Sequence, residues 1–412
     1  MSVHKLTEIY TEDALEMQRA RYALAANEFE KLYGTLPTRI FSAPGRTEVG
    51  GNHTDHNHGK VLAAGVSLDV IAMVVPADDG IIEVKSAGFP ADKVDTAELS
   101  VVKEEEGSSA ALIRGVAAGF VKNHHRIGGF KAYTTSNVLK GSGLSSSAAF
   151  EVLIGNILNG LYNDHSVSDV EIAQLSQFAE NVYFGKPSGL MDQMASSVGG
   201  FITIDFADPA KPVIEEINFD LASAGFNLCI VDTKGSHADL TPEYAAIPQE
   251  MKSLAGYFGK EVLRGIPKAE LIANAAELRE HYGDRALLRA LHFADENERV
   301  DAEKEALRSG DAGRFFELVK ASGRSSYMFL QNVFAVSAPD QQGLSLALYL
   351  AADVLGDEGA YRVHGGGFAG TIQAFVPASK LEKFKETMED CFGTGSCYVL
   401  SVRPFGGTEV EL

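Results

Sequence analysis

Residues 140–161, KGSGLSSSAAFEVLIGNILNGL, join a loop of glycine and serine to a long apolar stretch. The free N–H groups and the dipole at the start of a helix favour a bound anion. A plain serine N-cap would explain the loop equally well, and the Gly-Lys-Ser/Thr ending of a P-loop is absent. A core-facing helix is predicted from the i, i+3, i+4 spacing of Ala149, Phe150, Leu153, Ile154, Ile157, Leu158 and Leu161.

The length of 412 residues predicts two domains with a cleft between them, since one domain usually takes ~100–200 residues. Helical stretches and strands occur in both halves, which predicts an α+β fold with mixed and antiparallel sheets covered by helices. We expect one domain over residues 1–205 and the other over residues 206–412.

The net charge of −20 argues against nucleic acid or an anionic membrane as a partner, because both need a basic protein surface. The three cysteines match no zinc-site spacing and are expected to be reduced thiols. The N-terminus lacks the apolar core of a signal peptide, and the longest apolar run is short and interrupted by Asp353. These features predict a cytoplasmic protein.

A second glycine-rich loop, in RVHGGGFAGTIQAF, contains the pattern G-x-G-x-x-G at Gly365, Gly367 and Gly370. A dinucleotide fingerprint must open a helix, whereas TIQAFV after this loop is typical of a strand. We therefore exclude that interpretation. The loop is either a tight hairpin or a cover over a ligand.

A third loop, PGRTEVGGNHTDHNHG over residues 44–59, holds His53, Asp55, His56 and His58. Alternating histidine and aspartate are typical of hydrolytic metal sites, but no further ligand cluster completes a closed site. The same residues suit the recognition of hydroxyl groups, or a polar structural turn. All three interpretations stay open on the residues alone.

Taken in order, the three loops resemble the three motifs of the GHMP small-molecule kinases. GRTEVGGNHTDHNHG is similar to the galactokinase signature GRVNLIGEHTDYNGG, and GSGLSSSAAFEV is similar to GGGLSSSASLEV. HGGGFAG follows the third pattern, GAGFGG. The segments AENVYFGKPSGLMDQMASSVGG and RALHFADENERV also resemble the family, so the similarity runs from about residue 35 to residue 408.

The resemblance implies a two-domain GHMP kinase fold, with a ribosomal protein S5-like N-terminal domain and a ferredoxin-like C-terminal domain. It implies ATP-dependent phosphorylation of a free sugar at its anomeric hydroxyl, with galactose as the first substrate expected and galacturonate as the alternative. The implied cofactors are ATP and Mg²⁺. The expected partners are a small sugar and a nucleotide, without nucleic acid or membrane, in a monomer or weak homo-oligomer.

The resemblance also implies roles for individual residues. Asp192 would be the catalytic carboxylate facing the sugar hydroxyl, with Arg46 beside it. The sugar contacts would be Asn52, His53, Asp55 and Tyr244. Magnesium would be held by Ser147 and Glu180. The phosphates would lie against Gly141, Gly143, Leu144, Ser145, Ser146 and Ser147, and the third motif would be Gly365, Gly366 and Gly367. Without the resemblance, Asp192 would be read as a helix cap.

The main departure from the family pattern is Asn52, which stands where galactokinases have a glutamate that binds the sugar's 6-hydroxyl. Asparagine can donate as well as accept a hydrogen bond, so a carboxylate at C6 would be tolerated. The sequence DHNHG is also similar to the galacturonate-kinase branch. The exact sugar therefore stays open.

Two rival functions are a non-catalytic sugar and ATP-binding regulator and a metal-dependent hydrolase. Galactokinase-like regulators lose a Ser-Ala pair from the second motif, whereas this chain keeps LSSSAA in full. This difference favours turnover. The hydrolase rests on HTDHNH alone.

Overall fold

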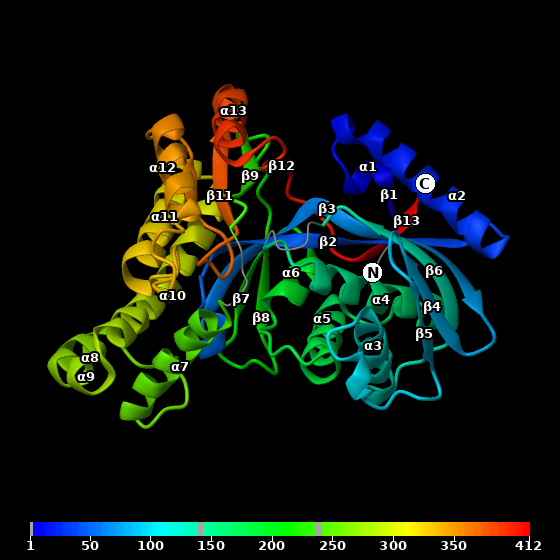
Figure 1. Ribbon diagram of the computed structural model, residues 1–412, viewed down its shortest axis with the longest axis horizontal. Helices are drawn as coiled ribbons and strands as arrows, with labels where there is room; N and C mark the ends of the chain where they lie inside the picture. The colour runs from blue at the N-terminus through cyan, green and yellow to red at the C-terminus, as the bar shows by residue number, and fades with distance from the viewer. Residues whose placement is uncertain (1–2, 139–142, 236–239) are drawn as a thin grey trace.

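The computed structural model describes residues 3–138, 143–235 and 240–412, and these form two β-sheets with helices packed on them (Figure 1). The larger sheet has the order β1-β13-β2-β3-β6-β4-β5, and in addition β7 pairs with β3 and β8 pairs with β7. The smaller sheet has the order β10-β11-β9-β12. This architecture confirms the α+β prediction.

The strands of the larger sheet pair mostly in antiparallel register, and the exceptions within the described part are β1 with β13 and β4 with β6. Their bounds are β1 Val3–Lys5, β2 Arg39–Gly50, β3 Lys60–Ala77, β4 Ile81–Ser86, β5 Ala91–Asp95, β6 Gly129–Ser136, β7 Phe201–Asp205, β8 Val213–Ile217 and β13 Thr408–Glu411. The smaller sheet contains β9 Phe226–Asp232, β10 Ala360–Val363, β11 Thr371–Pro377 and β12 Cys397–Leu400.

Helices cover both faces of the larger sheet (Figure 1). Strand β3 explains this arrangement, because successive side chains of a strand point to opposite faces. Ile71 and Met73 pack with α2, while Ala72 and Val74 belong to the core that includes α4. The helices before β7 are α1 Leu6–Ile9, α2 Leu15–Tyr33, α3 Ser109–Lys122, α4 Ser146–Tyr162, α5 Asp169–Phe178 and α6 Met191–Val198.

The remaining helices are α7 Thr241–Tyr257, α8 Lys268–Ala273, α9 Ala275–Tyr282, α10 Asp284–Arg308, α11 Ala312–Ser325, α12 Gly343–Leu355 and α13 Leu381–Phe392. Helices α11, α12 and α13 pack on the smaller sheet, α10 contacts β2 and β3 of the larger sheet, and α7, α8 and α9 pack against α10 (Figure 1). Short 3-10 turns occur at Glu12–Ala14, Asp55–Asn57, Lys103–Glu105 and Ala378–Lys380, and π-helical turns at Ala179–Phe184 and Ser326–Leu330. Within the described ranges, no helix is both long and apolar enough to cross a bilayer.

The membership of the sheets bears on the proposed domains. Strand β8 follows residue 205 but still belongs to the larger sheet, and β13 returns to that sheet at the end of the chain. The parallel pairing of β1 with β13 brings the two described ends of the chain together. The division at residue 205 therefore stays a prediction, while the sheets themselves change between β8 and β9.

The sequence motif at residues 44–59 was treated above as a loop, and this was wrong for its first half. Pro44 to Gly50 form the end of β2, and the register with β3 shifts between Pro44 and Arg46 and again between Glu48 and Gly50. Such bulges re-aim side chains and are frequent beside active sites. In this irregular part of β2 the strand contacts the smaller sheet, because Arg362 of β10 donates to the Val49 carbonyl at 2.5 Å.

Strand β3 also carries a buried carboxylate that joins distant parts of the chain. Asp69 is fully buried and accepts hydrogen bonds from Arg21 of α2 at 2.5 Å and from Arg403 near the C-terminus at 2.9 Å. Ser42 of β2 donates to it at 2.5 Å, and Tyr10 donates as well. This carboxylate therefore ties both ends of the chain to the larger sheet.

A second buried carboxyl group, Glu303 of α10, faces β2 with neither oxygen hydrogen-bonded among the described residues. Burial raises the pKa of Glu303 to about 8, although the charges of Arg362 and Arg299 oppose the rise. The folded protein therefore keeps this carboxyl group protonated at neutral pH. The contribution of Glu303 to the free energy of unfolding therefore depends on pH.

Glu303→Gln is expected to make the protein relatively more stable as the pH rises. Between the ordinary value of 4.5 and about 8, the unfolded chain loses this proton while the folded chain keeps it, so Glu303 lowers the stability of the wild type progressively. Glutamine does not titrate, so the variant avoids this loss. Across that pH range its free energy of unfolding rises relative to that of the wild type by on the order of 4 kcal/mol. Urea unfolding of the variant and the wild type at about pH 5 and about pH 8 measures the difference in their free energies of unfolding at each pH. An equal stability difference at both pH values would contradict the assignment.

Candidate active site

The centre of the candidate site is an ion pair between Arg46 of β2 and Asp192 of α6. The Arg46 Nε donates to Asp192 Oδ1 at 2.8 Å, and its Nη1 donates to the carbonyl of Gly143. The Asp192 side chain keeps 26% of its exposure, whereas Arg46 keeps 7%. The guanidinium is thus fixed between strand and loop, and the carboxylate stays open to a ligand.

Asp192 is ionised at neutral pH. Burial alone would raise the pKa of Asp192, but the charge and the hydrogen bond of Arg46 outweigh burial, with help from a hydrogen bond of Ser145, and the net pKa is lowered. A partly buried, ionised carboxylate beside an arginine is suited to accept or orient a hydroxyl proton.

The phosphate loop predicted from GSGLSSSA lies directly against this ion pair. The Arg46 N–H donates to the Leu144 carbonyl at 3.0 Å, and Ser145, the N-cap of α4, has a left-handed backbone with φ 55°. Ser146 and Ser147 form the first turn of α4 and are partly exposed. The positive end of the α4 dipole therefore faces the region of Asp192. Gly141 lies outside the described residues.

Glu180 lies beside the same helix start, on the π-helical turn that follows α5. It is buried, and Ser147 Oγ donates to its Oε1 at 3.0 Å. Lys186, Ser188 and Gln193 also donate to the Glu180 carboxylate, at 2.9, 2.7 and 2.7 Å. A serine hydroxyl and a carboxylate this close, next to a phosphate loop, fit Mg²⁺, which takes one or two protein oxygens in addition to phosphate oxygens.

The third motif, residues 364–370, contacts the first motif, residues 45–59, through its main-chain carbonyl groups. The Asn52 Nδ2 donates to the carbonyl of Gly365 at 2.8 Å, and His53 Nε2 lies 3.0 Å from that of Gly366. Tyr244 of α7 donates its hydroxyl to the carbonyl of Gly367 at 2.8 Å. Three of the predicted sugar contacts are therefore held by three successive carbonyls.

The hydrogen bond of His53 determines its chemistry. Burial, and then the neighbouring His56, lower the pKa of His53 to about 4, so the ring is neutral at pH 7. Since the Gly366 carbonyl can only accept, Nε2 carries the proton and Nδ1 is left as an acceptor. A neutral histidine in this tautomer can accept a hydrogen bond from a hydroxyl group.

Asp55 lies against the segment that leads into Asp192. A Cβ atom placed on Gly189 would lie 1.9 Å from Asp55 Oδ2, so only glycine leaves room for this carboxylate. Asp55 Oδ1 accepts the N–H of His56 at 2.9 Å. The structure thus places the first motif, residues 45–59 and called the sugar motif below because its predicted role is to bind the sugar, next to the loop of the candidate catalytic carboxylate.

Asn52 differs from the other predicted sugar contacts because it is fully buried. Its amide donates to Glu48 and to Gly365, and accepts from Ser326 and Asn332. These four hydrogen bonds use both donors and both acceptor positions of the amide. Glu48 is not among the site residues predicted from the sequence; the signal that could have revealed it is a charged residue inside a strand pattern.

The metal-cluster interpretation of His53, Asp55, His56 and His58 is not supported by their placement. Among the described residues, no group of three or more His, Cys, Asp or Glu side chains is arranged to hold a metal ion. His53 is committed to the third motif through Gly366.

Comparison with known proteins agrees with this geometry. Residues 107–200 match the family model of the GHMP kinases N terminal domain, and residues 27–76 match the galactokinase galactose-binding signature. The solved structure of Lactococcus lactis galactokinase complexed with galactose has a TM-score of 0.81 at 24% identity, covering 94% of this chain and 99% of that one. Methanococcus jannaschii mevalonate kinase has a TM-score of 0.62 at 15% identity, covering 88% and 98%. Fold and site together define a small-molecule kinase of the GHMP class.

Proteins of similar sequence identify the family within the GHMP kinases to which this chain belongs. A galactokinase of Streptomyces coelicolor is 34% identical over 379 residues, which are 91% of this chain and 94% of that protein. A galactokinase of Actinobacillus pleuropneumoniae serotype 3 is 31% identical over 89% of this chain and 92% of its own length. The chain belongs to the galactokinase family and is a phosphotransferase with an alcohol group as acceptor.

Proposed function

We propose that this protein transfers the terminal phosphoryl group of ATP to the anomeric hydroxyl of galactose, giving galactose 1-phosphate and ADP. The observation that carries the proposal is the 2.8 Å pair of Arg46 and Asp192, which lies between the sugar motif and the phosphate loop. A kinase needs its acceptor hydroxyl in line with the phosphoryl group, and this pair adjoins both sites.

In this mechanism, Asp192 binds the anomeric hydroxyl and takes its proton. Arg46 keeps the carboxylate ionised and places a positive charge where negative charge moves from the nucleotide to the acceptor. His53 and Asp55 orient the sugar through its hydroxyl groups, and Tyr244 supports the wall that faces them. The matched motifs and the contacts described above support these roles.

The phosphates would lie on the first turn of α4, where the free N–H groups and the serine hydroxyls can donate hydrogen bonds. Ser147 and Glu180 would hold Mg²⁺, which neutralises charge on the phosphates when it is bound. For that, Glu180 must exchange at least one of its present donors for the ion. Lys186 is the donor best able to move, since its side chain is 57% exposed.

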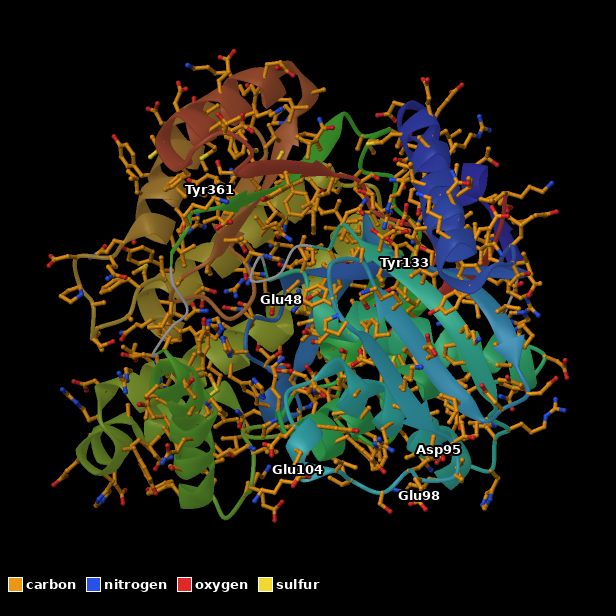
Figure 2. All side chains as sticks on the ribbon, turned by 45° about the vertical axis from the view of Figure 1, so that its right-hand side comes forward. Glu48, Asp95, Glu98, Glu104, Tyr133 and Tyr361 are labelled. Atoms are coloured by element: carbon orange, nitrogen blue, oxygen red, sulfur yellow. The ribbon has the colours of Figure 1, made fainter. Side chains whose placement is uncertain are left out.

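Glu180→Gln is expected to raise the Mg²⁺ concentration needed for half-maximal turnover by about tenfold or more, because a neutral amide is a poorer ligand for a hard cation than a carboxylate. Turnover measured against free Mg²⁺ at saturating ATP and sugar gives this value. The matched control is Glu104→Gln, an exposed glutamate at the outer rim of the molecule (Figure 2). An unchanged Mg²⁺ requirement for Glu180→Gln would remove Glu180 from the metal site.

The sugar is tested by ADP release with MgATP and galactose, galacturonate, N-acetylgalactosamine, arabinose or glucose. Galactose is expected to give the highest kcat/KM. Galacturonate is the second candidate, because position 52 carries an amide and not a carboxylate. Binding of sugar and ATP without ADP release would instead favour the regulator.

We further propose that the protein is cytoplasmic and is a monomer or weak homo-oligomer. Its nucleotide substrate and its three free cysteines fit a reducing compartment that contains ATP. Sedimentation of the purified protein measures its oligomeric state.

A further inference from the structure

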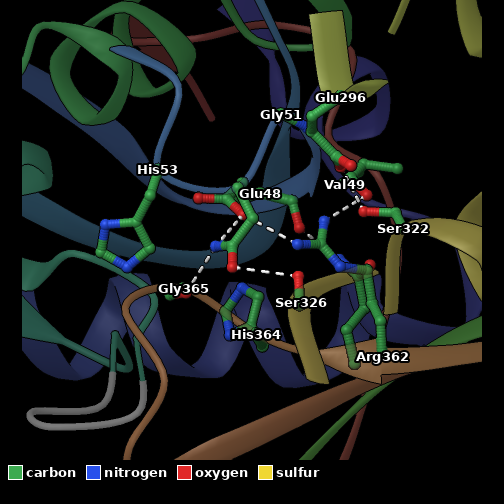
Figure 3. A network of polar contacts seen from close by, with 12 residues as sticks. Glu48, Val49, Gly51, His53, Glu296, Ser322, Ser326, Arg362, His364 and Gly365 are labelled. Carbon is green, nitrogen blue, oxygen red and sulfur yellow. Dashed lines mark hydrogen bonds and ion pairs between the residues drawn. The ribbon is translucent and has the colours of Figure 1, made fainter. Parts of the chain in front are cut away.

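The mechanism above leaves one buried acidic side chain of the sugar motif without a role. Glu48 lies at the end of β2 and is 5% exposed (Figure 2, Figure 3). Its Oε1 accepts a hydrogen bond from Asn52 Nδ2 at 2.7 Å. A buried carboxylate is costly unless it is paired, so its partners indicate why it is retained.

The main partner of Glu48 is Arg362 of β10, in the smaller sheet. Arg362 is fully buried and donates to Glu48 Oε1 at 3.1 Å and to the carbonyl of Val49 at 2.5 Å (Figure 3). Gln373 of β11 donates to the carbonyl of Glu48 at 3.0 Å. Two strands of the smaller sheet thus hold the sugar motif, and both adjoin the third motif, residues 364–370.

The contact with Glu48 fixes the direction of the Asn52 amide. With Nδ2 bound to Glu48 and Gly365, the oxygen faces Asn332 at 2.8 Å and Ser326 at 3.2 Å. The Asn52 main-chain carbonyl lies 3.0 Å from His292 Nε2. The side chain therefore has no free donor or acceptor to offer a sugar.

Comparison of the motif with its galactokinase form shows an exchange. The form GRVNLIGEHTDYNGG has asparagine at position 48 and glutamate at position 52, whereas this chain has Glu48 and Asn52. Because the two side chains touch, the pair keeps one carboxylate and one amide in either arrangement. In this chain the carboxylate of the pair is at position 48, where it also accepts a hydrogen bond from Arg362.

We propose that Glu48 is a positioning residue of the sugar site that holds the Asn52 amide away from the sugar, so that position 52 offers the substituent at C6 neither a carboxylate nor a free hydrogen-bonding group. The inference rests on the proposed sugar 1-kinase function. It assigns a specificity: sugars with a hydroxyl and sugars with a carboxylate at C6 are both accepted. In the exchanged arrangement, a carboxylate at position 52 would repel a carboxylate at C6.

The test compares the wild type, Glu48→Gln, and the double exchange Glu48→Asn with Asn52→Glu. The quantity measured is the ratio of kcat/KM for galactose to kcat/KM for galacturonate. The wild type is expected to show a ratio within about tenfold, and the double exchange to raise it by about 30-fold or more through the KM for galacturonate. The KM for ATP is expected to stay unchanged. Glu48→Gln is expected to raise the KM for both sugars, because Asn52 loses its charged acceptor.

Calorimetric binding of the two sugars gives the same ratio without turnover, so failure of the kinase function does not hide the result. A double exchange that folds and leaves the sugar ratio unchanged would overturn the proposal. So would a Glu48→Gln variant with a lower unfolding temperature but unaltered sugar affinity, because Glu48 would then be structural only. If the double exchange does not fold, Glu48→Gln decides alone.

Discussion

Asp192→Asn is expected to lower kcat for sugar phosphorylation by about 10³-fold, with the affinity for MgATP nearly unchanged. Asparagine keeps the size of the side chain and can still face Arg46, but it cannot take a proton from the anomeric hydroxyl. Removal of a positioned general base typically costs about 10²–10⁴-fold, and this base is also the charge partner of Arg46. The measurement is ADP release at saturating galactose, with nucleotide binding measured by calorimetry.

The matched control for this prediction is Asp208→Asn, at an exposed aspartate. Its kcat is expected to equal that of the wild type. A turnover by Asp192→Asn within a few fold of the wild type would show that another group handles the proton. Arg46→Lys is a useful companion, because it keeps a positive charge but not the two directed donors that reach Asp192 and Gly143.

Asp69→Asn is expected to destabilise the fold by about 3–5 kcal/mol. Burial would raise the pKa of Asp69, but the charges of Arg21 and Arg403 more than offset it, and the net pKa is lowered. Asparagine at this position would leave Arg403 fully buried without its anion. Breaking one member of a buried ion pair is costly because the remaining charge has lost its compensation.

Urea unfolding at neutral pH, with Asp208→Asn as control, measures the effect of Asp69→Asn. The affected contacts join α2 and the C-terminal segment to β3, so the early loss of these two segments should also appear as faster amide hydrogen exchange there. A loss of stability below about 1 kcal/mol would mean that the network contributes no more than an exposed salt bridge.

The parts of this fold that the sequence predicts well are those with a strong local pattern. Helix α4 has its apolar face at the expected spacing and runs over Ser146–Tyr162, starting after the serine-rich loop. Helix α2 ends at Tyr33 and is capped by Gly34, a residue type that adopts φ 71° without strain. Periodicity and capping act within a few residues, so a single sequence contains them.

The parts that the sequence does not predict depend on residues far apart in the chain. Nothing local shows that β2 continues through Arg46 to Gly50, because its pairing with β3 and its bulges are tertiary features. The burial of Asn52 likewise depends on Ser326, Asn332 and Gly365, which lie more than 270 positions away. The resemblance named the site residues but could not show that Asn52 faces inward.

The role of Glu48 is also not predictable from the sequence, because its partners are distant in the chain. In the sequence it is one charged residue among the polar residues of a motif, and its role becomes visible only when Arg362 and Gln373 are placed against it. Backbone carbonyls are equally invisible in a sequence, although those of Gly365, Gly366 and Gly367 hold three predicted sugar contacts.

The most direct test of the central claim is the identity of the product. The purified protein is incubated with MgATP and galactose, and the product is examined by phosphorus and proton NMR. We expect ADP together with a sugar phosphate whose phosphorus couples to the anomeric proton, and about 10³-fold slower formation of both products by the Asp192→Asn variant. Phosphate on another hydroxyl, or no transfer to galactose while the protein binds both ligands, would contradict it.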